Sequence, residues 1–326
     1  MTCSSGFRAL ALPAGLLALL AGTDPAQARD YRLGLITPPS HQWTLTAEEI
    51  AATLAERTEG RVNILVMAGG QLGNEARMLQ QLQSGSLDFG MFTVGEFANR
   101  NPDYGIFLAP FIAPDAKAAR ELLSGEVAGQ LLDGFTDFGL HGLAWGMAGL
   151  RQIALAEPAA TVADLAGQKI RTVPLAPELD FWRLLGAAPT PMPLPELYSA
   201  FANGQVSGMQ IDFEGTWNAG YYRHAGQVIR SDHMMFPMAA VASGRSWLGI
   251  DAADRAVIDE VFAEAVDAMV VRYGEIDATY LAEIEAAGVP VQQVDEAWFG
   301  AAGPQWYESW RDKAPMLSAL EAEAGR

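Results

Sequence analysis

The chain has 326 residues, half of them hydrophobic, with 39 acidic against 21 basic side chains and a formal net charge of −18. That charge argues against nucleic acid and against an anionic membrane surface as partners. A chain of this length can bury a large core and commonly divides into two lobes, and no low-complexity segment interrupts it.

The first 28 residues have the pattern of a signal peptide. Arg8 precedes an apolar run from Ala9 to Leu20, which is short for a membrane span, and Ala26-Gln27-Ala28 is the small-x-small pattern that signal peptidase reads. We predict cleavage after Ala28, with an N-terminal membrane anchor as the alternative. The only cysteine, Cys3, precedes the apolar run, so the mature chain would have no disulfide and no cysteine metal ligand.

Short apolar strands alternate with amphipathic helices after the signal. The predicted elements are a strand at 31–37, a helix at 46–58, a strand at 61–67, a helix at 74–84 and a strand at 87–92. Thr46 with Glu49 fits a capping box, and Asn74 fits an N-cap. Strands separated by helices favour parallel sheets with helices on both faces, which bind ligands at the carboxyl ends of their strands.

The segment from Asp251 to Ala287 carries apolar residues at three- and four-residue steps, with acids on the opposite face. Gly288 and Pro290 end the pattern. The segment is either one long helix or two helices broken near Gly274, and a single glycine costs only about 1 kcal/mol within a helix.

The stretch from Arg151 to Gly208 centres on one arginine. Asp164 to Gly167 predicts a helical turn with a glycine stop, and the strand that follows ends in Lys169-Ile170-Arg171. An arginine on an apolar strand needs an anionic partner once it is desolvated, and its planar fork matches a carboxylate at two points. Arg171 is therefore a candidate for binding the carboxylate of a ligand. Exposure at the surface, or pairing with one of the chain's own acids, is the alternative.

Several motifs in this order resemble the solute-binding proteins of tripartite ATP-independent periplasmic (TRAP) transporters, the DctP-like family. They are Gly60-Arg61-Val62, Gln71-Leu72-Gly73, Leu87-Asp88-Phe89, Pro110-Phe111, Lys169-Ile170-Arg171, Leu185 to Met192, Glu196 to Phe201 and Gly204-Gln205-Val206. The resemblance covers nearly the whole mature chain. It implies an α/β, two-lobed fold of the periplasmic-binding-protein type II kind, with a ligand cleft between the lobes and a long helix that spans them.

The same resemblance implies the domain organisation and the function. Residues 1–28 would be the signal peptide, 29–148 with 237–277 lobe I, and 149–236 with 278–326 lobe II. The protein would work in the periplasm, capture an organic acid and deliver it to the membrane subunits of a TRAP permease for ion-gradient-driven uptake.

The resemblance also assigns site residues. The arginine of the Lys-Ile-Arg strand holds the ligand carboxylate in the family, which implies that role for Arg171. Gly149-Leu150-Arg151 matches the family's glycine-x-arginine, so Arg151 is a second candidate for the clamp. The remaining candidates for ligand contact, by their place in these segments, are His41, Trp43, Thr93, Trp145, Gln210, Asp212, Trp217 and His233.

One departure bears on the ligand. After Gly204-x-Val206 the family usually continues Asp-Gly-Gln-Glu-Asn, whereas this chain reads Ser207-Gly208-Met209-Gln210-Ile211. Isoleucine in place of asparagine predicts an aromatic or branched monocarboxylate rather than a dicarboxylate or a sugar acid. Aromatic residues in or near the same segments favour the same ligand; they are Trp145, Trp182, Trp217, Tyr221 and Tyr222.

An enzyme that acts on a small carboxylate is the alternative function. Such an enzyme needs a nucleophile or an acid–base pair at a recognisable motif, and the sequence has no Gly-x-Ser-x-Gly elbow. The four histidines, at 41, 141, 224 and 233, lack the spacing of metal ligands. The sequence therefore favours binding without chemistry, and it predicts neither a metal nor a cofactor.

Overall fold

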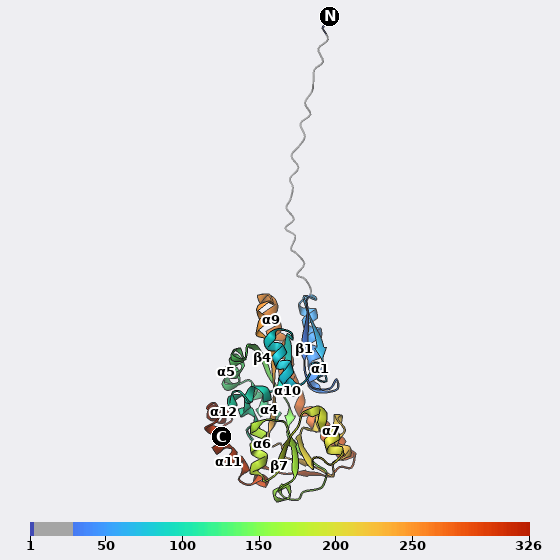
Figure 1. Ribbon diagram of the computed structural model, residues 1–326, viewed down its shortest axis with the longest axis vertical. Coiled ribbons are helices and arrows are strands. Elements are labelled where there is room, and N and C mark those ends of the chain that lie inside the picture. The colour runs from blue at the N-terminus through green and yellow to red at the C-terminus, as the bar shows by residue number, and fades with distance from the viewer. Residues whose placement is uncertain (3–28) are drawn as a thin grey trace.

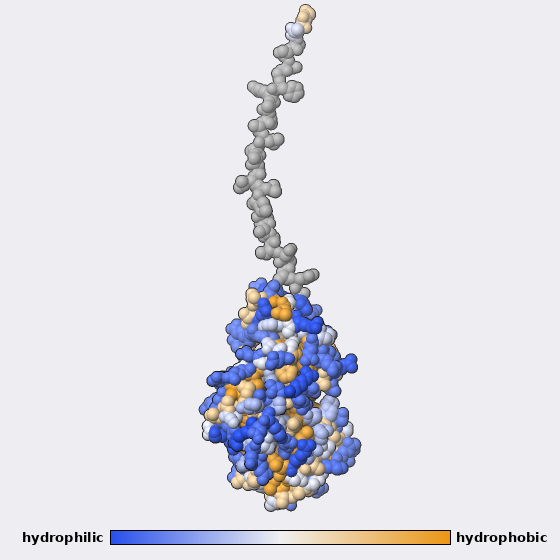
Figure 2. Space-filling view, turned by 60° about the vertical axis from the view of Figure 1, so that its left-hand side comes forward, coloured by the Kyte–Doolittle hydropathy of each residue, from blue (hydrophilic) through white to orange (hydrophobic). Residues whose placement is uncertain are grey.

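The computed structural model describes residues 1–2 and 29–326 and contains two β-sheets flanked by helices (Figure 1). The predicted signal peptide and its cleavage site lie outside the described residues. Within the described part of the chain, no helix is both long and apolar enough to cross a bilayer. Hydrophilic residues cover most of the face in Figure 2, with smaller apolar patches between them.

The first sheet has five strands in the order β2-β1-β3-β10-β4. They are β1 (Arg29–Gly34), β2 (Val62–Met67), β3 (Phe89–Thr93), β4 (Leu140–Leu150) and β10 (Met235–Ser243). β1 pairs in parallel with β2 and β3, whereas β10 is antiparallel to β3 and β4. The helices associated with this half are α1 (Gln42–Arg57), α2 (Glu75–Ser84), α3 (Gly95–Ala98), α4 (Ala116–Leu123), α5 (Glu126–Asp133) and α9 (Gly244–Leu248).

The second sheet has six strands in the order β11-β9-β5-β8-β6-β7. They are β5 (Gln152–Leu155), β6 (Lys169–Thr172), β7 (Ala188–Pro191), β8 (Gly208–Ile211), β9 (Gln227–Arg230) and β11 (Val291–Gln293). Its helices are α6 (Ala176–Leu184), α7 (Leu194–Ala202) and α8 (Phe213–Asn218). β6 runs parallel to β7 and β8, so the ends of β6 and β8 meet at one edge of the sheet.

The chain passes between the two sheets where β4 meets β5 and where β9 leads to β10. Gly149 at the first passage has a φ of +68°, and a Cβ there would lie 3.0 Å from the Asp277 Oδ1. Both facts favour glycine. Two of the predicted lobe boundaries, at 148/149 and 236/237, lie near these passages, whereas the third, at 277/278, falls inside the helix formed by residues 252–286. The assignment of residues to lobes stays a prediction. The C-terminal helices α11 (Ala302–Arg311) and α12 (Leu317–Glu323) follow β11, and α11 packs on α6.

Residues 252–286 form one helix, α10 (Ala252–Ala286), which continues through Gly274. The single long helix is therefore confirmed. α10 packs against β4 and α1 of the first half and against α8 of the second, so it spans both lobes. Its buried face, including Ile258, Phe262 and Tyr273, matches the predicted apolar stripe.

The predicted start of the first helix is wrong. α1 begins at Gln42 and not at Thr46, because the His41 side chain caps it: Nδ1 accepts a hydrogen bond from the Trp43 backbone N–H at 3.1 Å. Histidine is an uncommon N-cap, so the sequence pattern favoured the threonine. The cap of α2 is confirmed, since the Asn74 side chain accepts from the Arg77 N–H at 3.0 Å.

Candidate ligand-binding site

A cavity of about 840 Å³ lies between the two halves. Both sheets and their loops contribute to its wall. From the first half come residues that include Thr37, His41, Trp43, Glu75, Thr93, Glu96 and Asn99, and from the second half Arg151, Arg171, Ile211, Asp212 and Tyr221. A pocket of this size accommodates a small organic molecule.

Arg171 lies on β6 and is 2% exposed. Its Nε and Nη2 both donate to the Met192 carbonyl oxygen, at 3.0 and 2.9 Å, which fixes the plane of the guanidinium. Among the described residues, no acid lies within 4.0 Å of it. Burial lowers the pKa of Arg171 to about 10, although the charge of Glu178 opposes that shift. The arginine is thus a desolvated cation at the wall of a cavity, without an anion of its own.

Arg151 is placed differently from the sequence-based prediction. It lies between β4 and β5, and its Nη1 donates to Asp212 Oδ2 at 2.5 Å. Its guanidinium carbon stands 3.5 Å from the centre of the Phe236 ring, in cation–π geometry. Arg151 lines the cavity, but Asp212 already neutralises its charge. The second clamp residue therefore has an internal partner.

Asp212 follows β8 and has two roles. While Oδ2 pairs with Arg151, Oδ1 accepts from the Gly215 backbone N–H at 2.6 Å and so caps α8. The antiparallel register of β5 and β8 sets Gln152 opposite Ile211. Arg151, which precedes Gln152, and Asp212, which follows Ile211, therefore lie beside one another.

The opposite wall of the cavity carries carboxylates. The two oxygens of Glu75 accept from the Thr93 backbone N–H at 2.6 Å and from the Thr93 hydroxyl at 2.7 Å. Burial raises the pKa of Glu75 to about 7, and the nearby Glu96 raises it further. Glu96 and Asn99 also line this wall. Glu75 and Glu96 were not among the predicted site residues, since nothing in a helix-start pattern marks an acid as facing a cleft.

A buried carboxylate joins the two halves next to the cavity. Glu214 on α8 accepts from the Gln42 backbone N–H at 2.7 Å and from the Tyr273 hydroxyl at 2.8 Å, and it is 2% exposed. His41 Nε2 lies 3.7 Å from Glu214 Oε2, the oxygen that accepts from Tyr273. Burial lowers the pKa of His41 to about 4 and raises that of Glu214 to about 7. This site links α1, α8 and α10 in one network.

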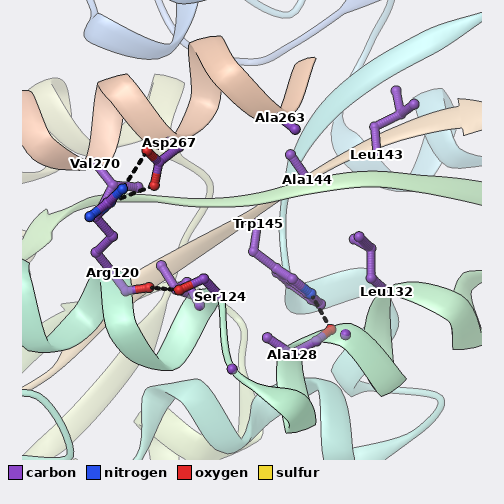
Figure 3. A pocket seen from close by; sticks show the side chains of 13 residues that line it. Arg120, Ser124, Ala128, Leu132, Leu143, Ala144, Trp145, Ala263, Asp267 and Val270 are labelled. Atoms are coloured by element: carbon purple, nitrogen blue, oxygen red, sulfur yellow. Dashed lines mark hydrogen bonds and ion pairs between the residues drawn. The ribbon is translucent and has the colours of Figure 1, made fainter. Parts of the chain in front are cut away.

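Trp145 does not line the cavity between the halves. It lies on β4 beside a separate pocket of about 310 Å³, and its indole N–H donates to the Ala128 carbonyl at 2.9 Å (Figure 3). Across that pocket, Arg120 pairs with Asp267 (Figure 3). Trp145 also packs against Phe107 and Phe135, so its role is in the core of the first half.

Three further candidates lie away from the cavity wall. Gln210 points to the opposite face of β8 from Ile211, because side chains alternate along a strand; it accepts hydrogen bonds from the Trp182 indole and binds His233. His233 is fully buried and stacks on Phe181. Trp217 stacks on Tyr222 with ring centroids 4.3 Å apart. Ile211 and Asn218, the chain neighbours of Gln210 and Trp217, reach the cavity instead.

His41, Trp43, Thr93, Asp212, Arg151 and Arg171 do line the cavity, and Ile211 lines it too. Their roles in binding remain predictions. Within residues 29–326, no group of three or more His, Cys, Asp or Glu side chains is arranged to hold a metal ion.

Two α/β lobes joined by crossing segments, with a buried arginine in the cavity between them, define a two-lobed solute-binding protein. The family model for bacterial extracellular solute-binding proteins, family 7 (DctP), matches residues 33–313, and the chain belongs to this family. The family is that of the TRAP-transporter solute-binding proteins.

Similar proteins cover nearly the full chain. A solute-binding protein of Chromohalobacter salexigens is 26% identical over 308 residues, 94% of this chain and 92% of its own length. A TRAP periplasmic solute-binding protein of Xanthobacter autotrophicus, solved with bound β-D-galacturonate, is 26% identical with a TM-score of 0.84, over 90% of this chain and 98% of that one. One of Roseobacter denitrificans with bound β-D-glucuronate is also 26% identical with a TM-score of 0.84, over 91% and 99%.

Proposed function

We propose that this protein captures a sugar acid in the periplasm and delivers it to a TRAP permease, without changing it chemically. The observation that carries the proposal is Arg171, a buried guanidinium at the cavity wall with no acid within 4.0 Å among the described residues. Burying a charge without a partner is costly, so the fold maintains this arginine for an anion that arrives from outside.

The side chains on the opposite wall suit a ligand that carries hydroxyl groups. Glu75, Glu96 and Asn99 offer oxygen atoms that accept hydrogen bonds, and sugar hydroxyls are donors. The relatives from Xanthobacter autotrophicus and Roseobacter denitrificans hold a galacturonate and a glucuronate, each with one carboxylate and several hydroxyls.

The predicted preference for an aromatic or branched acid over a sugar acid is not supported. Ile211 and Tyr221 do line the cavity, beside Trp43 and Phe236, whereas Trp145, Trp182, Trp217 and Tyr222 do not, so only part of the expected aromatic set reaches it. Apolar side chains form most of the lining, and polar and charged ones, including Glu75, Glu96 and Asn99, form the rest. The relatives solved with a galacturonate and a glucuronate, however, favour a sugar acid.

Thermal shift and calorimetry on residues 29–326 test the proposal. Galacturonate, glucuronate, galactonate and gluconate are compared with succinate, phenylacetate and the methyl ester of galacturonate. At least one sugar acid should raise the melting temperature, because a ligand that binds only the folded state stabilises it. The methyl ester should have no effect. Mass spectrometry of the recovered ligand should show it unchanged.

Two results would refute the proposal. One is a response to phenylacetate with none to any sugar acid, and the other is equal binding of galacturonate and its ester. Delivery is tested separately: uptake of the labelled acid into proteoliposomes that hold the TRAP permease subunits should require this protein.

A further inference from the structure

The two arginines that line the cavity differ in whether an acid of the protein already pairs with them. Within the described residues, Arg151 and Arg171 are the two arginines or lysines that line it, and Arg151 is already paired with Asp212. We infer that Asp212 determines specificity: by neutralising Arg151, it restricts the cavity to sugar acids with a single carboxylate and excludes aldarates, which carry one at each end. This inference rests on the proposed function and adds the charge class of the ligand.

The Arg151–Asp212 pair is built into the fold. Both residues are nearly inaccessible, at 4% and 3% exposed. The register of β5 with β8 places them together, and the cap on α8 holds the carboxylate from its other side. Phe236 covers the face of the guanidinium. An ion pair fixed by two strands, a helix start and an aromatic ring has no freedom to open for each ligand.

The charges that remain around the cavity are unfavourable for a dianion. Arg171 can neutralise one carboxylate. The other ionisable acids of the lining, besides the Arg151–Asp212 pair, are Glu96, Glu196 and Glu75, of which Glu75 is only partly ionised near pH 7 because its pKa is about 7. His41 stays neutral near pH 7, since burial lowers its pKa to about 4. A second carboxylate of the ligand would therefore be buried without a cation and close to acids of the same sign, and both effects oppose binding.

Position 212 lies next to the segment in which this chain departs from the family motif. The position after Ile211 is an acid in this chain, and it directly follows the residues that depart from the family's Gln-Glu-Asn pattern. An uncharged residue at 212 would leave two adjacent guanidinium groups, each raising the cost of the other's charge. Such a cavity would favour a dianion.

The decisive experiment compares galactonate with galactarate, which differ only in whether C6 is an alcohol or a carboxylate. Calorimetry on the wild-type chain should show galactarate at least about a hundredfold weaker than the best-bound monocarboxylate, because its second charge is unpaired. Asp212→Asn keeps an oxygen to cap α8 while removing the charge. It should strengthen galactarate binding at least about tenfold relative to that monocarboxylate.

The double variant Arg151→Gln/Asp212→Asn is the matched control. It removes both charges together, so the ratio of the two affinities should stay near the wild-type value, whereas a merely structural role of Asp212 would disturb both variants alike. Asp212→Ser, which also retains a capping oxygen, serves as a second uncharged variant should Asp212→Asn fail to fold.

The outcomes separate the two proposals. If the wild-type chain binds none of the sugar acids, the proposed function falls and this inference with it. If it binds a monocarboxylate but binds galactarate equally well, or if the uncharged variants leave the ratio unchanged, only the role of Asp212 is overturned.

Discussion

Replacing Arg171 should separate ligand binding from folding. Arg171→Ala removes the guanidinium that faces the cavity, while its other hydrogen bonds go only to the Met192 carbonyl. Since Nε and Nη2 are engaged there, Nη1 and the second hydrogen of Nη2 remain for a carboxylate. These two donors match the two oxygens of one carboxylate group.

The size of the loss follows from those two bonds. A hydrogen bond to a charged group contributes about 1.5–3 kcal/mol, so two contribute about 3–6 kcal/mol. At about 1.4 kcal/mol per tenfold change, Arg171→Ala should weaken binding of the cognate sugar acid by at least about a hundredfold. Arg171→Lys should recover only part of this, because an ammonium group lacks the planar fork.

The stability of the ligand-free Arg171→Ala variant should rise slightly or stay the same, although its ligand affinity falls. Burial lowers the pKa of Arg171 to about 10, so the folded state without ligand is penalised for holding this charge. The melting temperature of ligand-free Arg171→Ala should therefore equal or slightly exceed that of wild type, offset by the loss of the two bonds to Met192. Calorimetric titration and thermal melting of the same samples measure both quantities.

Arg183→Ala provides the control. Arg183 lies on α6, twelve residues further on, with its side chain 61% exposed and paired with Asp180. Its removal should leave ligand affinity unchanged. Unchanged affinity in Arg171→Ala would refute the clamp, and a large drop in melting temperature without ligand would show that the arginine serves the fold instead.

Three further predictions concern other parts of the molecule. Burial raises the pKa of Glu75 and Glu214 to about 7 and that of Asp277 to about 8, so the folded state holds protons that the unfolded chain releases; the free energy of unfolding should fall as the pH rises from about 4 to about 8, and Glu214→Gln should reduce that slope in urea titrations at each pH. Trp145→Phe should lower the melting temperature but leave sugar-acid affinity unchanged in calorimetry, since Trp145 lies outside the cavity between the halves. Asn74→Ala should cost about 1 kcal/mol of stability by urea unfolding, whereas Asn203→Ala, at the C-cap of α7, should cost less.

Local patterns predicted the fold well, because its determinants are local. The apolar stripe of residues 252–286 predicted helix, although it left one long helix or two open, and Asn74 predicted the start of α2. The start of α1 was missed because the cap is the imidazole of His41, whose ring also faces the cavity. His41 thus lines the cavity and also caps α1, whereas N-cap preferences favour residues such as threonine in that role.

The site was harder to predict than the fold, because contacts across the cleft join residues distant in sequence. The Lys-Ile-Arg strand identified Arg171 as a candidate, and the structure shows why it lacks an internal partner: the acids nearest in sequence, such as Glu178, bind backbone groups instead. Arg151, like Arg171, has one apolar and one polar neighbour on the chain, so its flanks do not show that its charge is paired. Only the pairing of β5 with β8 sets Asp212 beside it.

An acidic protein can bind an anion when one cation in its cavity has no acid as a partner. A net charge of −18 repels an anion at a distance, but at physiological salt the field of exposed charges is screened beyond about 8 Å. Inside the cavity the outcome depends on which cation still lacks a partner. Arg171 has none, and Arg151 has one at 2.5 Å. The acid at position 212 thus limits the ligand charge that the site accepts but hardly changes the net charge of the protein, which is why composition could exclude nucleic acid but could not exclude a carboxylate.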